Sequence, residues 1–219
     1  PDTAVFLNGG SVAPGGTAAF GWKSVRVAGG TVQSTSSLNT YNGNLIISGG
    51  TYQLMAYAAD SVAGFFRTEG TGILDMTTQS PSLNLSVRDS VVFAGGVSNL
   101  SAGVLRVWGN FVQRTSAFAF QASGSHATQF AGTAAQAISF ANPAQGATGS
   151  HFNALQITNS GASGVSLLTN VFATAQLQDA STTTQELLAG NGNTLTVGGT
   201  NIWHFQFNNA PLVIDTTAL

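Results

Sequence analysis

The sequence predicts an all-β protein that folds as a right-handed parallel β-solenoid, with a β-sandwich or tandem β-sandwiches as the alternative. Three observations lead to this prediction. Short runs of alternating apolar and polar residues recur along the chain, amphipathic helical patterns are almost absent, and glycine turns return at intervals near multiples of about 20 residues. We expect one elongated β domain that spans residues 1–219.

The strand candidates are runs of about four to six residues bounded by Gly, Asn, Ser or Thr. The clearest is VVFA at 91–94, which Gly-Gly follows directly. One segment, QLMAYAADSVA at 53–63, has apolar residues at helical spacing, but it lies between strand-like runs and fits a loop equally well. The remaining expected strands are 24–28, 44–48, 72–76, 82–87, 103–107, 117–121, 137–140, 154–158, 164–168, 194–198, 202–207 and 211–214.

The spacing of the turns favours the solenoid over the sandwich. Strand-like runs end in turns at Gly30, Gly50, Gly96, Asn110 and Gly199, which are 20, 46, 14 and 89 residues apart. With one short exception, these separations fit multiples of about 20 to 23 residues, the length of one solenoid coil. Sandwich turns usually carry Pro and charged residues, whereas this chain has only five Pro and 6% charged residues.

The scarcity of charge also excludes several classes of partner. Charged residues make up about a quarter of an ordinary soluble protein. With a net charge of −2 and all six basic residues in the first 114 positions, the chain has no basic surface for nucleic acid or an anionic membrane. No apolar run approaches the ~18 residues of a membrane-spanning helix, and the chain contains no Cys, which excludes disulfides and thiolate metal sites.

The segment 102–177 carries a recognisable pattern: AGVLRVWGNFVQ, then HATQFAGTAAQAISFANP, then SHFNALQITNSGASGVSLLTNVFATAQLQ. It resembles the β-solenoid repeat segments of large secreted bacterial cell-surface proteins of the adhesin type. The resemblance covers about a third of the chain and carries no catalytic residues. It implies an extracellular or cell-surface scaffold such as a stalk, an adhesin or a filament subunit. The matching positions are Gly109, Asn110, Phe111, Gly132, Thr133, Gln136, Phe140, Asn142, Pro143, Phe152, Leu155, Ile157 and Asn159.

Phenylalanine is frequent in and around this segment, and the expected role of these rings is an aromatic stack along the solenoid core. The residues concerned are Phe111, Phe118, Phe120, Phe130, Phe140 and Phe152.

Catalytic chemistry is not indicated. Polysaccharide-active β-helix enzymes gather Asp and Glu on one face, whereas the eight acids here are scattered among the arginines. Asp75 and Asp89 could approach each other within a coil, but pairing with arginines is their expected role. His126 and His151 stand in similar Gly-Ser-His settings 25 residues apart, so we expect them at equivalent corners of successive coils, with a paired metal site as the alternative. We predict a protein that is not an enzyme and binds no metal or cofactor.

Glycan binding without cleavage needs exposed aromatic rings on which sugars stack. Trp108 directly follows Val107, which is expected to point inward, so strand alternation should place the indole outward. Trp108 is therefore the candidate glycan contact. The other aromatic platforms are Trp22, Trp203, Tyr41, Tyr52 and Tyr57.

Two apolar runs near the termini suggest how copies could join. A solenoid leaves open strand edges at its ends, and such edges template further pairing. We therefore expect a homopolymer, a self-assembling extracellular or cell-surface filament or stalk. The alternatives are an adhesin that binds a cell-surface or matrix glycan and, less favoured, a polysaccharide-active β-helix enzyme. The predicted subunit-joining residues are Thr3, Ala4, Val5, Phe6, Leu7, Pro211, Leu212, Val213 and Ile214.

Overall fold

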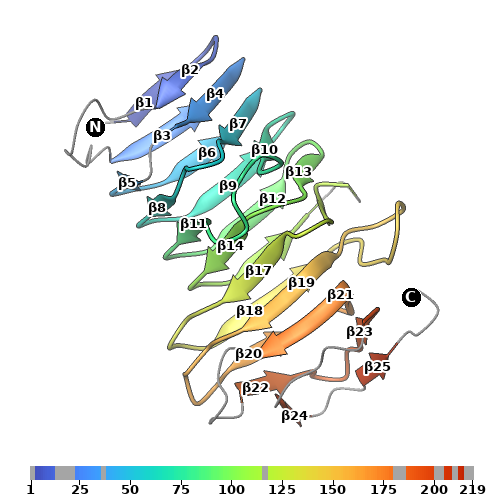
Figure 1. Ribbon diagram of the computed structural model, residues 1–219. Helices are drawn as coiled ribbons and strands as arrows, with labels where there is room; N and C mark the ends of the chain where they lie inside the picture. The colour runs from blue at the N-terminus through green and yellow to red at the C-terminus, as the bar shows by residue number, and fades with distance from the viewer. Residues whose placement is uncertain are drawn as a thin grey trace.

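The computed structural model describes residues 3–12, 23–35, 38–114, 118–179, 186–199, 205–208 and 212–214. Over these residues the chain is all-β and winds into a parallel β-solenoid of about 8 turns (Figure 1). Every pair of neighbouring strands is parallel, and neighbours in a sheet are one coil apart in sequence, as in Val27↔Ile47. The rest of the coil serves as the long connection that parallel strands require. No described segment forms a helix that is long and apolar enough to span a membrane.

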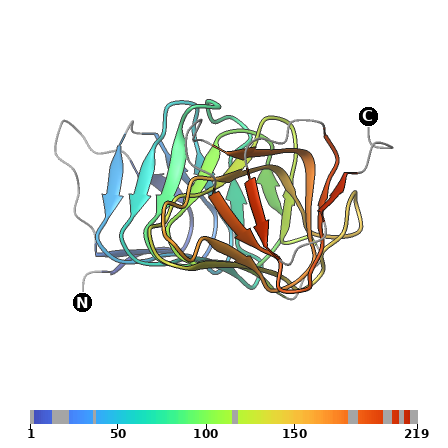
Figure 2. The same cartoon turned by 90° about the horizontal axis from the view of Figure 1, so that it is seen from below.

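Three sheets run along the long axis, and Figure 2 shows them surrounding a common interior. Sheet A contains β1 (Thr3–Phe6), β3 (Ser24–Val27), β6 (Leu45–Ile47), β9 (Phe66–Glu69), β12 (Val91–Ala94), β15 (Phe111–Gln113), β18 (Gln136–Phe140), β20 (Val165–Leu167), β22 (Glu186–Ala189) and β24 (Phe205–Asn208). Sheet B contains β2 (Gly10–Val12), β4 (Thr31–Ser34), β7 (Thr51–Leu54), β10 (Ile73–Asp75), β13 (Ser98–Leu100) and β16 (Phe120–Ala122). Sheet C contains β5 (Asn39–Tyr41), β8 (Asp60–Val62), β11 (Asn84–Val87), β14 (Val104–Val107), β17 (Ala127–Phe130), β19 (Phe152–Ile157), β21 (Val171–Asp179), β23 (Leu195–Val197) and β25 (Leu212–Ile214).

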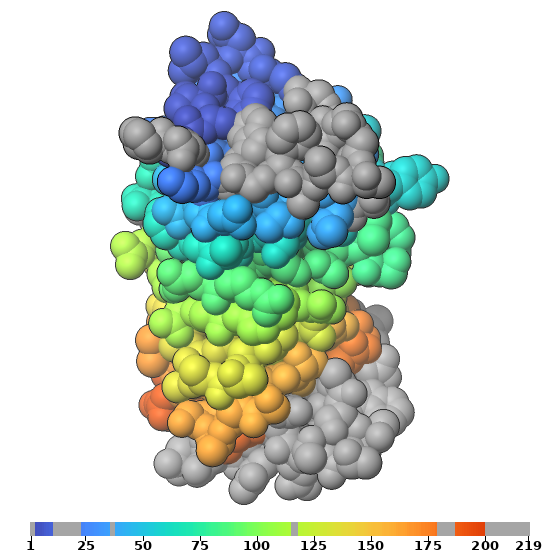
Figure 3. Space-filling model, turned by 90° about the vertical axis from the view of Figure 1, so that its left-hand side faces the viewer, coloured from blue at the N-terminus to red at the C-terminus, as the bar shows by residue number. Residues whose placement is uncertain are grey.

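The coils stack in chain order, so the colour bands of Figure 3 follow one another along the molecule. Sheets A and C extend over its whole length, whereas sheet B ends at β16. We call residues 3–130, from β1 to β17, the three-sheet region, and residues 136–214, from β18 to β25, the two-sheet region. The two regions form one continuous solenoid because β15 pairs with β18 and β17 pairs with β19.

The edge of sheet B at β16 is covered by the connection between β18 and β19. Gln121 forms a parallel bridge with His151. The His151 amide donates to the Phe120 carbonyl at 3.2 Å, and the Ala122 amide donates to the His151 carbonyl at 3.2 Å. This pairing satisfies backbone groups that an open edge would leave free.

Glycines form the corner at which the chain passes from sheet A to sheet B. Gly30 and Gly50 have φ of 67° and 78°, a left-handed conformation that side chains rarely adopt. A Cβ on Gly50 would lie 2.1 Å from the carbonyl oxygen of Gly30 in the preceding coil. The backbone conformation and the lack of space for a side chain therefore both require glycine at this position. Of the turns that the sequence indicated, Gly30, Gly50 and Gly96 are thus stacked at this corner, whereas Asn110 and Gly199 follow strands of sheet C.

One apolar core runs through the solenoid. In the three-sheet region it is mostly Val, Leu and Ile, and where sheet B ends it becomes a cluster of phenylalanine rings whose centroids lie 4.7 to 6.3 Å apart. Phe111 contacts five of these rings. The predicted aromatic core is confirmed for Phe111, Phe120, Phe130, Phe140 and Phe152, and Phe66 and Phe93, which were not predicted, also belong to it. The prediction is wrong for Phe118, which is 42% exposed.

The thirteen expected strands all lie on strands of the structure, with bounds shifted by up to three residues where the chain is described. The segment 53–63 is not a helix: it contains the end of β7, a turn and β8. Among the strands that the sequence did not reveal, β5, β8, β9 and β15 each turn a polar side chain inward, so they lack the apolar alternation that marks a strand.

Candidate functional site

The predicted subunit-joining residues lie on strands at the two ends of the solenoid. β1 is the first strand of sheet A, and among the described residues it pairs only with β3, from Thr3↔Ser24 to Phe6↔Val27. β25 is the last strand of sheet C and pairs only with β23. Val5 and Leu7 are 54% and 66% exposed, while Pro211 lies outside the described residues. Each strand thus has one edge without a described strand beside it.

The two end strands belong to different sheets, which limits how copies could stack. Head-to-tail continuation of sheet A would place β24 of one copy against β1 of the next. Continuation of sheet C would place β25 against β5. Sheet B begins at β2 but ends inside the molecule at β16, so β2 has no counterpart at the other end. β1 and β25 therefore cannot pair with each other as one continued sheet, and a joint needs β24 and β5 as well.

Trp108 lies at the corner after β14 and is partly buried. The guanidinium carbon of Arg88 lies 3.9 Å from the centre of the indole, and that of Arg106 lies 5.9 Å from it. A cation this close to a ring is held by the π electrons. The ring that was predicted to stack against a sugar is thus already in contact with the protein's own arginine.

The other aromatic platforms divide between the core and the surface. Tyr41 and Tyr52 are buried, so they cannot receive a sugar from solvent, and the prediction is wrong for them. Tyr57 is 79% exposed in the turn between β7 and β8. Trp22 and Trp203 lie outside the described residues.

The two buried tyrosines belong to a hydrogen-bonded network around Asp60 in the core of the three-sheet region. Ser34 Oγ and Asn39 Nδ2 each donate to Asp60 Oδ1 at 2.8 Å, and the Tyr52 hydroxyl donates to Oδ2. The Tyr41 hydroxyl lies 2.5 Å from that of Tyr52 and donates to it, because the Tyr52 proton is already given to Asp60.

Burial raises the pKa of Asp60 above its usual range, and the donated hydrogen bonds oppose that rise. Burial also raises the pKa of Tyr41 and Tyr52, and the Asp60 charge raises both further. Every side-chain donor of the network has an acceptor, so it is a closed structural element that does not reach solvent.

The acids do not form a catalytic pair. Asp75 lies on β10 of sheet B and accepts hydrogen bonds from the Thr77 amide and hydroxyl at 2.9 and 2.8 Å. Asp89 lies at the corner between sheets C and A and accepts from the Ser90 amide at 2.7 Å. The expectation that these two acids pair with arginines is wrong: the ion pairs of the described residues involve Glu69.

His126 and His151 do not occupy equivalent corners, contrary to the expectation. Ala127 pairs with Ala154, so the residue opposite His126 in the next coil is Asn153. His126 is fully buried with Nδ1 2.8 Å from the Ala102 carbonyl oxygen, and its burial lowers its pKa to about 4. Burial lowers the pKa of His151 as well, and its Nδ1 lies 3.1 Å from the Ala144 carbonyl oxygen. No cluster of three or more metal-ligating side chains occurs among the described residues.

The outer faces of sheets B and C carry rows of amide side chains in register. On sheet B, Gln33 Nε2 donates to Gln53 Oε1 at 2.9 Å, and Gln53 Nε2 donates to Asp75 Oδ2 at 3.3 Å. On sheet C, Gln156 Nε2 donates to Gln178 Oε1 at 2.8 Å. These contacts join successive coils on the surface, so polar groups that are mostly uncharged cover these two faces.

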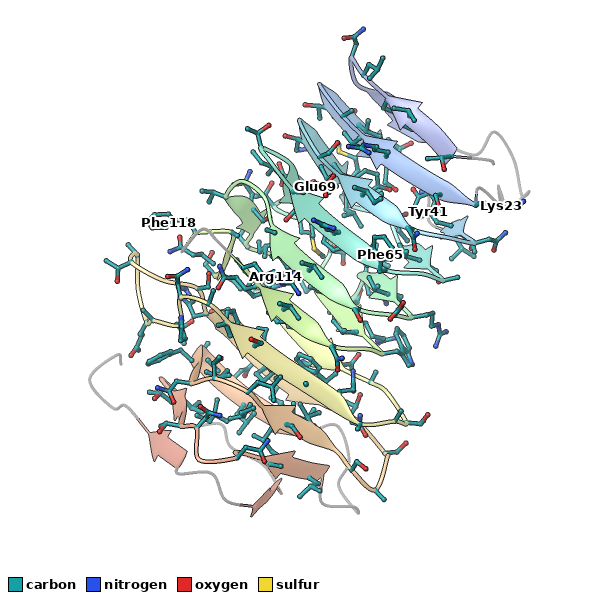
Figure 4. The ribbon with its side chains drawn as sticks, turned by 180° about the vertical axis from the view of Figure 1, so that it is seen from behind. Lys23, Tyr41, Phe65, Glu69, Arg114 and Phe118 are labelled. Atoms are coloured by element: carbon teal, nitrogen blue, oxygen red, sulfur yellow. The ribbon has the colours of Figure 1, made fainter. Side chains whose placement is uncertain are left out.

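The outer face of sheet A differs because it carries a network of ion pairs and a hollow of about 280 Å³. Glu69 forms an ion pair with Arg67, whose Nε lies 3.1 Å from Oε2, and accepts a hydrogen bond from Arg26 Nη2 at 3.4 Å. Figure 4 labels Phe65, Glu69 and Arg114 on this sheet. This site is not evident in the sequence, because its residues belong to successive coils and are about 20 to 25 positions apart from one coil to the next. Only the register of the coils brings them together.

Comparison with known proteins gives no relative: no family model, no curated protein and no solved structure matches the chain. The resemblance to secreted bacterial surface proteins therefore stays a prediction from residues 102–177.

Proposed function

We propose that the chain is an extracellular or cell-surface structural protein whose copies join end to end through the strands at the ends of its sheets, forming a filament or stalk. The observation that carries this proposal is the pair of sheet ends at β1 and β25, each with one edge that no described strand covers. Backbone N–H and C=O groups on such an edge bind another strand. A head-to-tail contact that does not close into a ring continues into a filament.

The composition supports the same proposal. Charge is 6% of the chain, so repulsion between copies is weak. The amide rows on sheets B and C already hydrogen-bond within the molecule, so these faces offer few free polar groups for side-by-side contact between copies.

Electron microscopy of the purified protein with an edge-blocking variant tests the proposal. Proline removes a backbone N–H and obstructs a neighbouring strand, so Val5→Pro in β1 should shorten or abolish filaments that the unchanged protein forms. Val97→Pro is the control, since Val97 is a comparably exposed valine, 47% against 54%, in the turn before β13. Monodisperse single particles of the unchanged protein across salt and pH would refute the proposal, as would equal filament loss in both variants.

A further inference from the structure

The hollow on the outer face of sheet A is built by three successive coils. It is lined by Phe65 and Arg67 at β9, Asp89, Ser90 and Val92 at β12, and Arg114 directly after β15. Its volume of about 280 Å³ lies just below the range of ~300–1,000 Å³ typical of small-molecule sites, so it suits a single sugar residue rather than a whole oligosaccharide.

Arg67 lines the hollow and is held at its Nε by an ion pair. The Nε lies 3.1 Å from Glu69 Oε2, and Glu69 is itself paired with Arg26. Within the described chain, neither Nη atom of Arg67 makes a hydrogen bond, and the side chain is 47% exposed. A guanidinium held by an ion pair at Nε, with no hydrogen bond at its terminal nitrogens, is suited to bind a carboxylate through two hydrogen bonds.

The charge around the hollow favours an anion. Three of the six basic residues, Arg26, Arg67 and Arg114, lie on this face, against two carboxylates, Glu69 and Asp89. The face is therefore locally positive although the whole chain carries a net charge of −2.

The remaining lining groups point to a ligand with hydroxyls and an apolar face in addition to its charge. Asp89 Oδ1 accepts from the Ser90 amide and hydroxyl at 2.7 and 3.1 Å, while Oδ2 has no partner among the described residues and can accept from a hydroxyl. Phe65 and Val92 supply the apolar surface against which the C–H groups of a sugar ring pack. A simple inorganic anion would use none of these three groups.

We propose that this hollow binds a uronic-acid residue of an acidic polysaccharide. Arg67 and Arg114 hold its carboxylate, Asp89 and Ser90 bind its hydroxyls, and Phe65 packs against its ring. The hollow is separate from the sheet ends, so this proposal and the assembly proposal stand or fall independently.

Calorimetric titration with oligogalacturonate at low salt, beside a neutral malto-oligosaccharide of equal length, tests the proposal. We expect saturable binding of oligogalacturonate only. Because a charge-assisted contact to a carboxylate is lost, Arg67→Gln should weaken binding about tenfold or more, and Phe65→Ala should weaken it about fivefold. Arg106→Gln is the matched control: it removes the same charge from the outer face of sheet C and should change the affinity less than about twofold.

Three results would overturn the assignment. Oligogalacturonate that does not bind excludes the ligand class, and equal weakening by Arg67→Gln and Arg106→Gln shows general attraction of a polyanion. Equal binding of the neutral sugar, or displacement of oligogalacturonate by equimolar phosphate, shows that a carboxylate-bearing sugar is not what the hollow recognises. Arg114→Gln, with its circular dichroism compared with that of the unchanged protein, replaces Arg67→Gln if that variant does not fold.

Discussion

The three-sheet and two-sheet regions reach the same parallel stacking by different means. In the three-sheet region the chain turns from sheet A into sheet B at stacked glycines such as Gly30 and Gly50, where backbone packs directly on backbone. The two-sheet region lacks this corner, and at its first turn from sheet C to sheet A a buried amide holds the backbone: Gln136 Oε1 accepts from the Gly132 amide at 2.9 Å and from Asn159 Nδ2 at 2.7 Å. The backbone groups at a corner therefore need hydrogen-bond partners, which come from the neighbouring coil or from a buried amide side chain. No single residue type is required.

The regions also differ in what they present to solvent. All six basic residues and the hollow on sheet A belong to the three-sheet region, while the two-sheet region is nearly uncharged. The buried network around Asp60 also lies in the three-sheet region, whereas the phenylalanine cluster lies at the junction of the two. Ligand contact is therefore proposed for one region, and both regions contribute an end to the proposed filament.

The junction is the place where a substitution should have the largest effect. Phe111→Ala removes a ring that contacts five others across the boundary, and the cavity should cost about 4 kcal/mol of unfolding free energy in chemical denaturation. Val112→Ala on the outer side of the same strand should cost less than about 1 kcal/mol. Similar costs for both variants would show that the aromatic cluster does not couple the regions.

His126 and Asn153 occupy the same register in adjacent coils, on the two sides of the boundary between the three-sheet and two-sheet regions. The pH dependence of stability is therefore a second test of this boundary. Burial lowers the pKa of His126 to about 4, and its Nε2 has no partner among the described residues. The folded state thus binds a proton more weakly than the unfolded chain. Stability is complete above pH ~6.5 and falls by about 3 kcal/mol as the pH approaches 4.

His126→Asn should remove this dependence, measured as the unfolding free energy in urea at pH 7 and pH 4.5. Asp60 contributes the opposite sign, because its raised pKa makes its contribution fully present below the usual Asp pKa and lost as the pH rises through the folded value. Asp60 is present in both proteins, so its contribution cancels when the pH dependence of His126→Asn is subtracted from that of the unchanged protein. An unchanged pH slope in the variant would mean that His126 is not the group responsible.

Substitutions of two glycines should lower the unfolding free energy least. They separate backbone conformation from close contact between coils as the reason for glycine. Gly50 and Gly146 have nearly equal φ, 78° and 81°, but a Cβ on Gly50 would meet the Gly30 carbonyl oxygen at 2.1 Å, whereas nothing lies within 4 Å of one on Gly146. Gly146→Ala should therefore cost only the conformational strain, about 1 kcal/mol, and Gly50→Ala about 2 kcal/mol or more. Thermal melting compares the two, and equal shifts would exclude close coil contact as the reason for glycine at this corner.

The strands that the sequence revealed are those whose inward residues are apolar, such as β12 with Val91 and Phe93. β8 could not be recognised because its inward residue is Asp60. Two of the donors that satisfy this carboxylate, Ser34 and Asn39, lie on the previous coil, and the spacing of Gly turns defines that register only roughly. The end strands β1 and β25 could be predicted because the apolar residues that mark them lie within each strand and depend on no contact with another coil.

Trp108 shows the same limit at the candidate site. The sequence indicates a Trp after an inward Val, but it does not say what lies beside the ring. Arg88 lies over it because the two residues are 20 positions apart, one coil, and this spacing is the signal that could have identified the pair. The hollow on sheet A involves coils of unequal length, since Phe66 pairs with Val91 and Val91 with Phe111, so no fixed spacing would have assembled it.

End-to-end joining is tested most directly by hydrogen exchange measured by mass spectrometry. The exchange is compared between a dilute sample, in which the protein is monomeric, and a concentrated sample, in which it is assembled. We expect slower exchange on assembly in peptides that contain β1, β5, β24 and β25, with no change in the central strand β12. No added protection at the end strands, or equal added protection along the whole solenoid, would contradict it.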